Sequence, residues 1–157
     1  MTVMRIYLDT SVWSLAISEG VSEYREASKD IFEHAKLFDW RLVSSEIVLG
    51  EFEGFSPKQR KLAFDLVEES EAEIWIAEDE IHALANDYIG FEVVTRNHFL
   101  DSLHVATATI AECDLLLSWN FRHIANINKA RKFIAVNEIR GYNKPIKICT
   151  PMEAYEI

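Results

Sequence analysis

Four polar side chains, far apart in the sequence, are of the types that hold a hard metal ion: Asp9, Glu51, Asp101 and Asn120. Mg²⁺ and Mn²⁺ prefer oxygen ligands, above all carboxylates. A divalent cation beside a phosphodiester neutralises its charge and supplies hydroxide at neutral pH. If the four side chains converge, the chemistry they offer is metal-dependent hydrolysis of a phosphate ester.

Two of these residues follow apolar runs that are typical of strands. Asp9 comes directly after Arg5–Leu8, and Asn120 lies just beyond Leu115–Ser118. Ligands of open α/β sheets collect outside the carboxyl ends of the strands. If the two runs are neighbouring strands, Asp9 and Asn120 therefore face one crevice.

The other two residues lie on predicted helices. Glu51 follows Gly50 on a helix expected over Glu46–Phe52, and Asp101 begins a helix expected over Leu100–Glu112.

Each of the four residues also has a purely structural interpretation. Asp9 is alternatively a turn residue or the N-cap of the segment from Thr10, and Glu51 a solvated helix acid. Asp101 is alternatively a helix cap favoured by the helix dipole, and Asn120 a turn or cap residue. These alternatives weaken when the four residues are considered as a set.

Short apolar runs alternate with amphipathic stretches, which indicates βαβ units around a parallel sheet. Strands are expected at Arg5–Leu8, Arg41–Val43, Ile74–Ile76, Leu115–Leu117 and Ile146–Cys149. Besides the two helices above, five more are expected. One spans Ser22–Leu37, one runs from a cap at Ser56 to Glu69, and one begins at a capping box at Thr150. The other two are Asp79–Ile89, which Gly90 closes, and Ile127–Arg140, which Gly141 stops. Leu115–Leu117 is apolar on both faces, which suits a central parallel strand.

Length and charge restrict the class of protein. The 157 residues fit one domain, residues 1–157, and the net charge of −10 argues against a simple basic nucleic-acid-binding surface. It does not exclude an enzyme that contacts phosphate through divalent cations.

No apolar stretch approaches the roughly 18–20 residues that a membrane helix needs. The first ten residues hold no basic region or cleavage site, so we expect a non-secreted, cytoplasmic protein without membrane partners. Cys113 and Cys149 are expected to pack as reduced thiols.

Four segments, in the correct order, resemble the motifs of PIN-domain nucleases. The first, Tyr7–Ser11, is an apolar strand that ends in Asp and a hydroxyl pair. The second, Ser44–Phe52, is a serine-led helix with its acid about two turns in. The third, Asp101–Ala108, is the most specific, and the fourth, Asp114–Ile124, is a strand that leads to a hydroxyl and a polar ligand. The resemblance implies a single PIN-like α/β domain with a central, mostly parallel sheet between helices, a three-layer α/β/α fold.

The same resemblance implies a metal-dependent endoribonuclease of the VapC-like toxin type. Asp9, Glu51 and Asp101 would be the acids that bind Mg²⁺ or Mn²⁺, and RNA the substrate, cleaved to leave a 5′-phosphate. A small antitoxin protein and a homodimer are the partners that such toxins commonly have. The sequence departs from the family at Asn120, where many PIN domains have Asp. Asparagine offers an oxygen without charge, so cation binding should weaken.

Two other functions compete with this one. Because Asn120 lacks the fourth charge, the chain is alternatively a catalytically weak or inactive binding module derived from a nuclease. A haloacid-dehalogenase-like phosphatase also has Asp after its first strand, but it needs a second Asp where this chain has Ser11. No P-loop or GxGxxG motif supports a nucleotide-binding fold.

Several further side chains are candidates for supporting roles. Thr10, Ser11 and Ser118 either orient ligands or cap local structure, and Arg122 and His123 either meet the RNA backbone or form a solvated face. His104, one turn after Asp101, is expected mainly as a packed helix residue. The tryptophans Trp13, Trp40, Trp75 and Trp119 are expected in the core or on a partner surface, with base stacking as the alternative.

Overall fold

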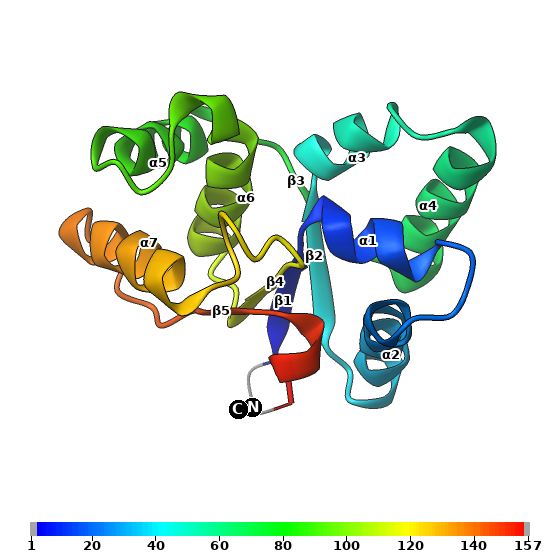
Figure 1. The fold of residues 1–157 in the computed structure, drawn as a ribbon. Helices are drawn as coiled ribbons and strands as arrows, with labels where there is room; N and C mark the ends of the chain where they lie inside the picture. Colours follow the sequence, from blue (N-terminus) through cyan, green and yellow to red (C-terminus); the bar gives the residue numbers. More distant parts are fainter. Residues whose placement is uncertain (1–2, 156–157) are drawn as a thin grey trace.

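The protein folds around a parallel sheet of five strands, seen here in a computed structural model that describes residues 3–155 (Figure 1). The strands are β1 (Arg5–Leu8), β2 (Arg41–Ser45), β3 (Glu73–Trp75), β4 (Leu115–Leu117) and β5 (Lys147–Cys149). Their order in the sheet is β3-β2-β1-β4-β5, and each neighbouring pair is parallel. The chain therefore builds outward from β1 to β3 and then crosses back to β4 on the other side of β1. This reversal between β1 and β4 is where open α/β sheets form a ligand-binding crevice.

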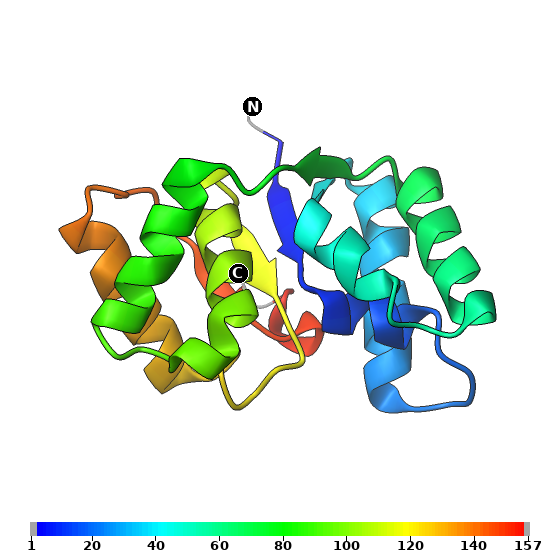
Figure 2. The same ribbon diagram turned by 90° about the horizontal axis from the view of Figure 1, so that it is seen from above.

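Helices cover both faces of the sheet, as Figures 1 and 2 show. Within the described residues the α-helices are α1 (Thr10–Ala16), α2 (Glu23–Leu37), α3 (Glu46–Phe52), α4 (Pro57–Ser70), α5 (Asp79–Gly90), α6 (Phe99–Ile110) and α7 (Ile127–Ile139). Helices α1 to α4 lie on one side and α5 to α7 on the other. Two short 3₁₀ helices are η1 (Arg96–His98) and η2 (Pro151–Glu153). The predicted three-layer α/β/α fold is thus confirmed.

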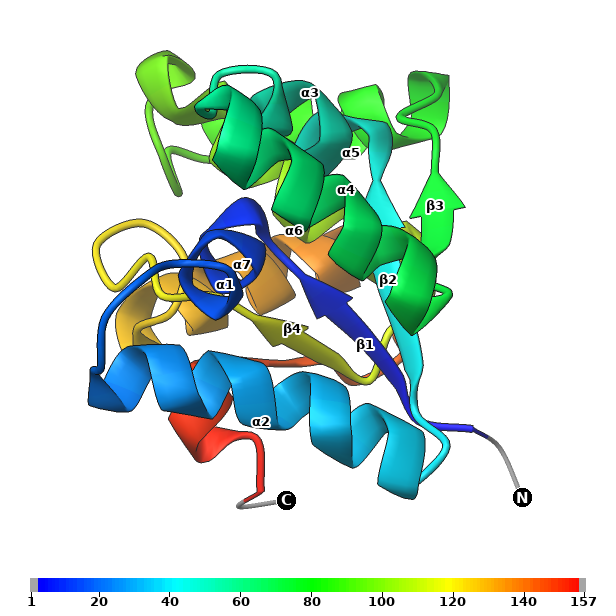
Figure 3. The ribbon, with the colours of Figure 1, turned by 90° about the vertical axis from the view of Figure 1, so that its right-hand side faces the viewer.

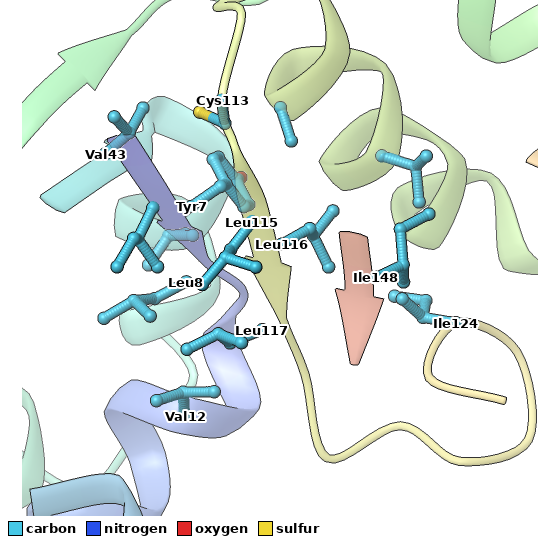
Figure 4. Close-up of a cluster of buried hydrophobic side chains, with 14 of the residues drawn as sticks. Tyr7, Leu8, Val12, Val43, Cys113, Leu115, Leu116, Leu117, Ile124 and Ile148 are labelled. Carbon is cyan, nitrogen blue, oxygen red and sulfur yellow. The ribbon is translucent and has the colours of Figure 1, made fainter. Parts of the chain in front are cut away.

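The core is centred on the two inner strands β1 and β4. Ile6, Tyr7 and Leu8 of β1 and the three leucines of β4 are at most 1% exposed, and Figure 4 shows their side chains packed together. Each fully buried aliphatic side chain contributes roughly 2 kcal/mol. The two strands therefore form a stable base for the polar residues that follow them. The prediction that Leu115–Leu117 is a central strand is confirmed.

Some element boundaries differ from the predicted ones. Helix α1 was not foreseen as a helix, because it is only seven residues long and depends on the Asp9 cap. Strand β3 lies one residue earlier than expected. Helix α5 continues through Gly90, and the left-handed residue that follows is Glu92, at φ 60°. Gly90 is therefore not the closing residue, whereas Gly141 is left-handed just after α7, at φ 87°, as expected.

Two further sequence expectations can be compared with the structure. Cys113 and Cys149 are both buried, as predicted for packed thiols. None of the helices in residues 3–155 combines the length and apolar character needed to cross a bilayer.

Candidate functional site

Asp9 stands at the carboxyl end of β1, where both of its oxygens are held by hydroxyl groups. It is 4% exposed and is the N-cap of α1. Its Oδ1 accepts hydrogen bonds from the backbone N–H of Ser11 at 3.0 Å, from Ser11 Oγ at 2.5 Å and from the N–H of Val12 at 3.4 Å. Its Oδ2 accepts from Ser118 Oγ, at the end of β4, at 2.5 Å. The capping role of Asp9 is confirmed, and the carboxylate has one orientation.

Burial makes the charge of this carboxylate unfavourable. Loss of solvent raises the pKa of Asp9 above its ordinary value, and the charge of His104 and the bonds from Ser11, Ser118 and Val12 offset this only in part. A nearby cation would favour the ionised form. Asp9 therefore has the electrostatic character of a cation ligand.

Glu51, near the end of α3, is joined to the segment after β1. Its Oε1 accepts from Thr10 Oγ1 at 2.9 Å and lies 2.8 Å from His104 Nε2. Its side chain is 34% exposed. Burial raises the pKa of Glu51, but the hydrogen bond and charge of His104, together with the bond from Thr10, outweigh it and leave the pKa below its ordinary value. Glu51 is thus an ionised acid that is bonded to Thr10, the residue after Asp9.

His104 connects α6 to the first two strands through a buried chain of polar groups. Its Nδ1 lies 2.8 Å from the hydroxyl of Tyr7 on β1, and that hydroxyl lies 2.8 Å from Ser45 Oγ at the end of β2. Ser45 is the N-cap of α3, the helix that carries Glu51. The ring of His104 is therefore fixed by contacts at both nitrogens.

The charges around His104 show how the three predicted acids are arranged. Burial alone lowers the pKa of His104, but the bond to Glu51 and the charges of Asp9, Glu51 and Asp101 together raise it above its ordinary value. The hydrogen bonds of Glu51, to Thr10 next to Asp9 and to His104 on the helix of Asp101, link three of the four predicted segments.

Asp101 lies in the first turn of α6, beside a pair of histidines. Its Oδ2 is 3.7 Å from His98 Nδ1, and the ring of His98 stacks on that of His123 with centroids 3.7 Å apart. Burial raises the pKa of Asp101, the charges of His104, His123 and His98 oppose the rise, and the charge of Glu51 adds to it. Asp101 therefore lies beside the imidazole ring of His98, and the charge of Glu51 opposes its ionisation.

Asn120 uses its side-chain oxygen within a turn. Its Oδ1 accepts the backbone N–H of His123 at 3.0 Å, and its own N–H donates to Ser118 Oγ at 2.9 Å. The turn interpretation of Asn120 is thus the one that its hydrogen bonds support. Its contact with the acids runs through Ser118, which donates to Asp9.

The donor set suits a hard cation in chemistry, although it is not a complete coordination shell. Among the described residues, no three His, Cys, Asp or Glu side chains are grouped closely enough to hold an ion as they stand. Mg²⁺ is commonly bound through one or two carboxylates with several retained waters. Asp9, fixed and buried, and Asp101, whose side chain is 20% exposed, match that requirement.

A cavity of about 640 Å³ opens at the amino ends of the strands and is lined by Arg5, Trp40, Arg41, Glu71 and Lys144, among others. Arg5, Arg41 and Lys144 are paired with acids or carbonyl groups, through contacts to Glu73, to Glu71 O and to Asp114. The predicted site is at the opposite, carboxyl edge, where ligands of open α/β sheets collect.

Sequence reasoning overlooked the hydrogen bonds of two residues at the site. Tyr7 was expected only as a strand residue and Ser45 only as part of the serine-led start of a helix, and nothing in those patterns indicates that their hydroxyls meet. His104 was expected mainly as a packing residue. Its spacing of one turn from Asp101 was the signal that placed it on the same face of α6.

Two solved structures share the architecture of this chain. VapC20 of Mycobacterium tuberculosis, a toxin that cleaves the Sarcin-Ricin loop, superposes with a TM-score of 0.59 at 15% identity, over 74% of this chain and 92% of its own. A chain of VapBC2 from Rickettsia felis, bound to a DNA fragment from its promoter, superposes with a TM-score of 0.57 at 16% identity, over 92% of this chain and 97% of its own. No protein-family model and no curated protein sequence matches the chain. At these identities the likeness concerns the fold alone: the chain shares the α/β architecture of these two structures, in agreement with the PIN-like fold that its four motifs led us to expect.

Proposed function

We propose that the protein is a metal-dependent endoribonuclease in which Asp9, Glu51 and Asp101 hold Mg²⁺ or Mn²⁺ against an RNA phosphate. One observation carries the proposal: Glu51 Oε1 is bonded to Thr10, the residue after Asp9, at 2.9 Å and to His104, on the helix that carries Asp101, at 2.8 Å. These contacts lie at the carboxyl edge of the sheet, where the connections from β1 and β4 diverge. The fold is shared with a toxin that cleaves RNA. Ligand-binding sites of open α/β folds are expected at the carboxyl edge of the sheet.

Each side chain has a role that follows from its surroundings. When bound, the cation neutralises phosphate charge and lowers the pKa of a water molecule. Asp9 is the preorganised ligand, because Ser11 and Ser118 hold both of its oxygens. Asp101 is the second ligand, and Glu51 completes the site directly or through water.

Asn120 is proposed to orient a water molecule from the edge of the site. Its side-chain oxygen accepts the N–H of His123 and stabilises the turn. The side-chain NH₂ of Asn120 is therefore the group that would contact the water molecule. The turn also places the hydroxyl of Ser118 against Asp9.

The cellular role that fits best is that of the toxin in a toxin–antitoxin pair acting in the cytoplasm. The net charge of −10 favours a small antitoxin with a basic segment. One of the two similar structures is a VapBC assembly. A homodimer belongs to the same proposal.

An RNA-cleavage assay with and without Mn²⁺ tests the enzyme proposal. We expect cleavage of single-stranded RNA that requires Mn²⁺ and is abolished in Asp101→Asn and Asp9→Asn. Asp65→Asn, which makes the same charge change at an exposed position on α4, is the matched control and should cleave normally. Equal cleavage in EDTA, or full activity of purified Asp101→Asn, would refute the proposal.

A catalytically inactive binding module is the second candidate. The observation in its favour is that the oxygen of Asn120 is engaged in a turn and that the acids of the described residues do not form a complete shell. Calorimetric titration separates the two functions. Saturable Mn²⁺ binding supports the nuclease, whereas RNA binding without Mn²⁺ binding supports the module.

A further inference from the structure

Three aromatic side chains from two distant segments form a cluster beside the candidate site. Tyr24 lies in the first turn of α2, and Trp119 and Phe121 follow β4. The ring centroids are 4.6 Å apart for Tyr24 and Trp119, and 6.2 Å apart for Phe121 and each of the other two. We call these three residues the aromatic platform. Figure 3 shows the loop after β4 beside the beginning of α2.

The platform has a buried base and an exposed surface. Trp119 is 8% exposed, and its Nε1 donates to Ser28 Oγ of α2 at 2.7 Å. Tyr24 and Phe121, by contrast, are 44% and 49% exposed. Two aromatic rings are therefore held at the surface by a fixed indole beneath them.

The platform is joined to Asp9 by short hydrogen bonds. The backbone N–H of Trp119 donates to Ser11 Oγ at 2.9 Å, and that hydroxyl donates to Asp9 Oδ1. The residue before Trp119 is Ser118, which donates to Asp9 Oδ2. The backbone of the platform is thus connected to Asp9, one of the carboxylates that are proposed to hold the cation.

The same loop carries a cationic side chain. Arg122 is exposed, and the next residue, His123, stacks on His98 beside Asp101. An exposed guanidinium therefore follows the platform in the sequence, in a chain whose net charge is −10. Such groups fit a polyanion better than a neutral or acidic partner.

These features together identify what the exposed rings could bind. Unpaired RNA bases are recognised by stacking on aromatic side chains, and their phosphates by arginine and lysine. We propose that Tyr24 and Phe121 form a stacking site for one unpaired nucleobase of the RNA, next to the phosphate at the acids. This inference rests on the proposed function and deepens it: the substrate is single-stranded or looped RNA, and a continuous duplex is excluded because its bases stay stacked on each other.

Binding measurements with short RNA test the stacking site without relying on cleavage. The probe is a single-stranded RNA of about ten nucleotides that contains 2-aminopurine, whose fluorescence falls when the base stacks. It is titrated into Asp101→Asn protein with Mn²⁺ and into the wild-type chain in EDTA. Tyr24→Leu and Phe121→Leu keep apolar bulk but remove the ring. Tyr24→Phe and Phe121→Tyr keep the ring.

We expect each leucine variant to bind at least about fivefold more weakly and to lose quenching, since one stacked base contributes about 1–3 kcal/mol. The variants that keep the ring should behave as their parent. Phe38→Leu, an exposed aromatic at the far end of α2, should change nothing. Tighter binding of the same sequence as a duplex, unchanged quenching in the leucine variants, or no saturable binding in either protein would overturn the inference. Unchanged RNA binding would instead assign the exposed rings to a protein contact.

The outcomes also separate this inference from the proposed function. Loss of quenching in the leucine variants of a protein that never cleaves RNA would leave the stacking site standing and remove the enzyme. Mn²⁺-dependent cleavage together with unchanged RNA affinity in the leucine variants would support the enzyme and remove the stacking site.

Discussion

His104 Nε2 on α6 lies 2.8 Å from Glu51 Oε1 on α3, although 53 residues of sequence separate them. The other ring nitrogen of His104 contacts Tyr7, and Tyr7 contacts Ser45 at the N-terminus of α3. The helix that carries Glu51 is therefore bonded to the sheet through its N-cap, Ser45, and to α6 through Glu51 near its C-terminus. His104 is best understood as the residue that positions Glu51.

Replacing His104 with leucine should both loosen Glu51 and destabilise the fold. The change leaves the buried hydroxyl of Tyr7 without one partner and removes the bond between His104 and Glu51, which should lower the free energy of unfolding by about 2 kcal/mol. Urea unfolding measures this. Tyr7→Phe removes both contacts of the Tyr7 hydroxyl but leaves the His104–Glu51 contact in place, and it should have the smaller effect. A His104→Leu protein as stable as wild type would contradict this role.

Metal binding should stabilise the protein through Asp9 and Asp101. A ligand that binds only the folded state at about 100 times its Kd contributes about 2.7 kcal/mol. Mn²⁺ should therefore raise the thermal midpoint of the wild type and leave those of Asp9→Asn and Asp101→Asn unchanged. Differential scanning fluorimetry makes the measurement, with Asp65→Asn as the variant that keeps the shift. A shift of wild-type size in Asp9→Asn would argue against these ligands.

Asp9→Asn should also stabilise the protein in the absence of metal. Because burial raises the pKa of Asp9 in the fold, the carboxylate opposes folding progressively as pH rises through and above its ordinary value. Asparagine keeps an oxygen for the N-cap bonds and carries no charge. In EDTA at pH 7 the variant should therefore melt above the wild type. A clearly lower midpoint would show that the bond from Ser118 outweighs the charge.

Asn120→Asp should strengthen cation binding while keeping the turn. One oxygen of the new carboxylate still accepts the N–H of His123, as Oδ1 of Asn120 does now, and the added charge favours a divalent ion. Calorimetry should show a lower Kd for Mn²⁺ than in the wild type. Asn120→Ala removes the turn bond as well and should lower stability by about 1 kcal/mol. Equal Mn²⁺ affinity in wild type and Asn120→Asp would place residue 120 outside the reach of the ion.

The ion pair between Arg5 and Glu73 should govern part of the acid sensitivity. Arg5 donates from both terminal nitrogens, at 3.0 and 2.8 Å, to the two oxygens of Glu73. The bond from Arg5 lowers the pKa of Glu73, although burial opposes it, and a bond from Trp75 and the charges of Arg5 and Arg41 lower it further. The resulting stability is present above pH 4.5, the ordinary value, and is lost as pH falls through the lower pKa of the folded state.

Glu73→Gln should therefore be less stable than wild type at pH 7 by roughly 1 kcal/mol or less, because both partners are partly exposed. The difference should shrink as pH falls below 4.5. Urea unfolding at several pH values measures both effects. Glu19→Gln, in an exposed pair with Lys58, is the control and should show a smaller pH-dependent difference, because water screens that pair. A Glu73→Gln deficit that is constant from pH 7 to pH 3 would exclude the ion pair as its cause.

Much of the fold could be predicted because its signals are local. The apolar run Leu115–Leu117 indicated a central strand, and Ser56 is the N-cap of α4 that the pattern suggested. The short helix α1 escaped prediction because seven residues hold too little periodicity. Gly90 was misjudged because the left-handed turn falls on Glu92, where the Val93 N–H reaches back to Tyr88 O.

The sequence by itself determined the strands, most helices and the turn at Asn120, since side-chain pattern and capping act over a few residues. Only the tertiary structure decided that His104 meets Glu51 and that Tyr24 packs on Trp119. The contacts of His104 and Tyr24 join helices to segments about 50 to 95 residues away. They depend on how the helices pack over the sheet, which no local pattern specifies.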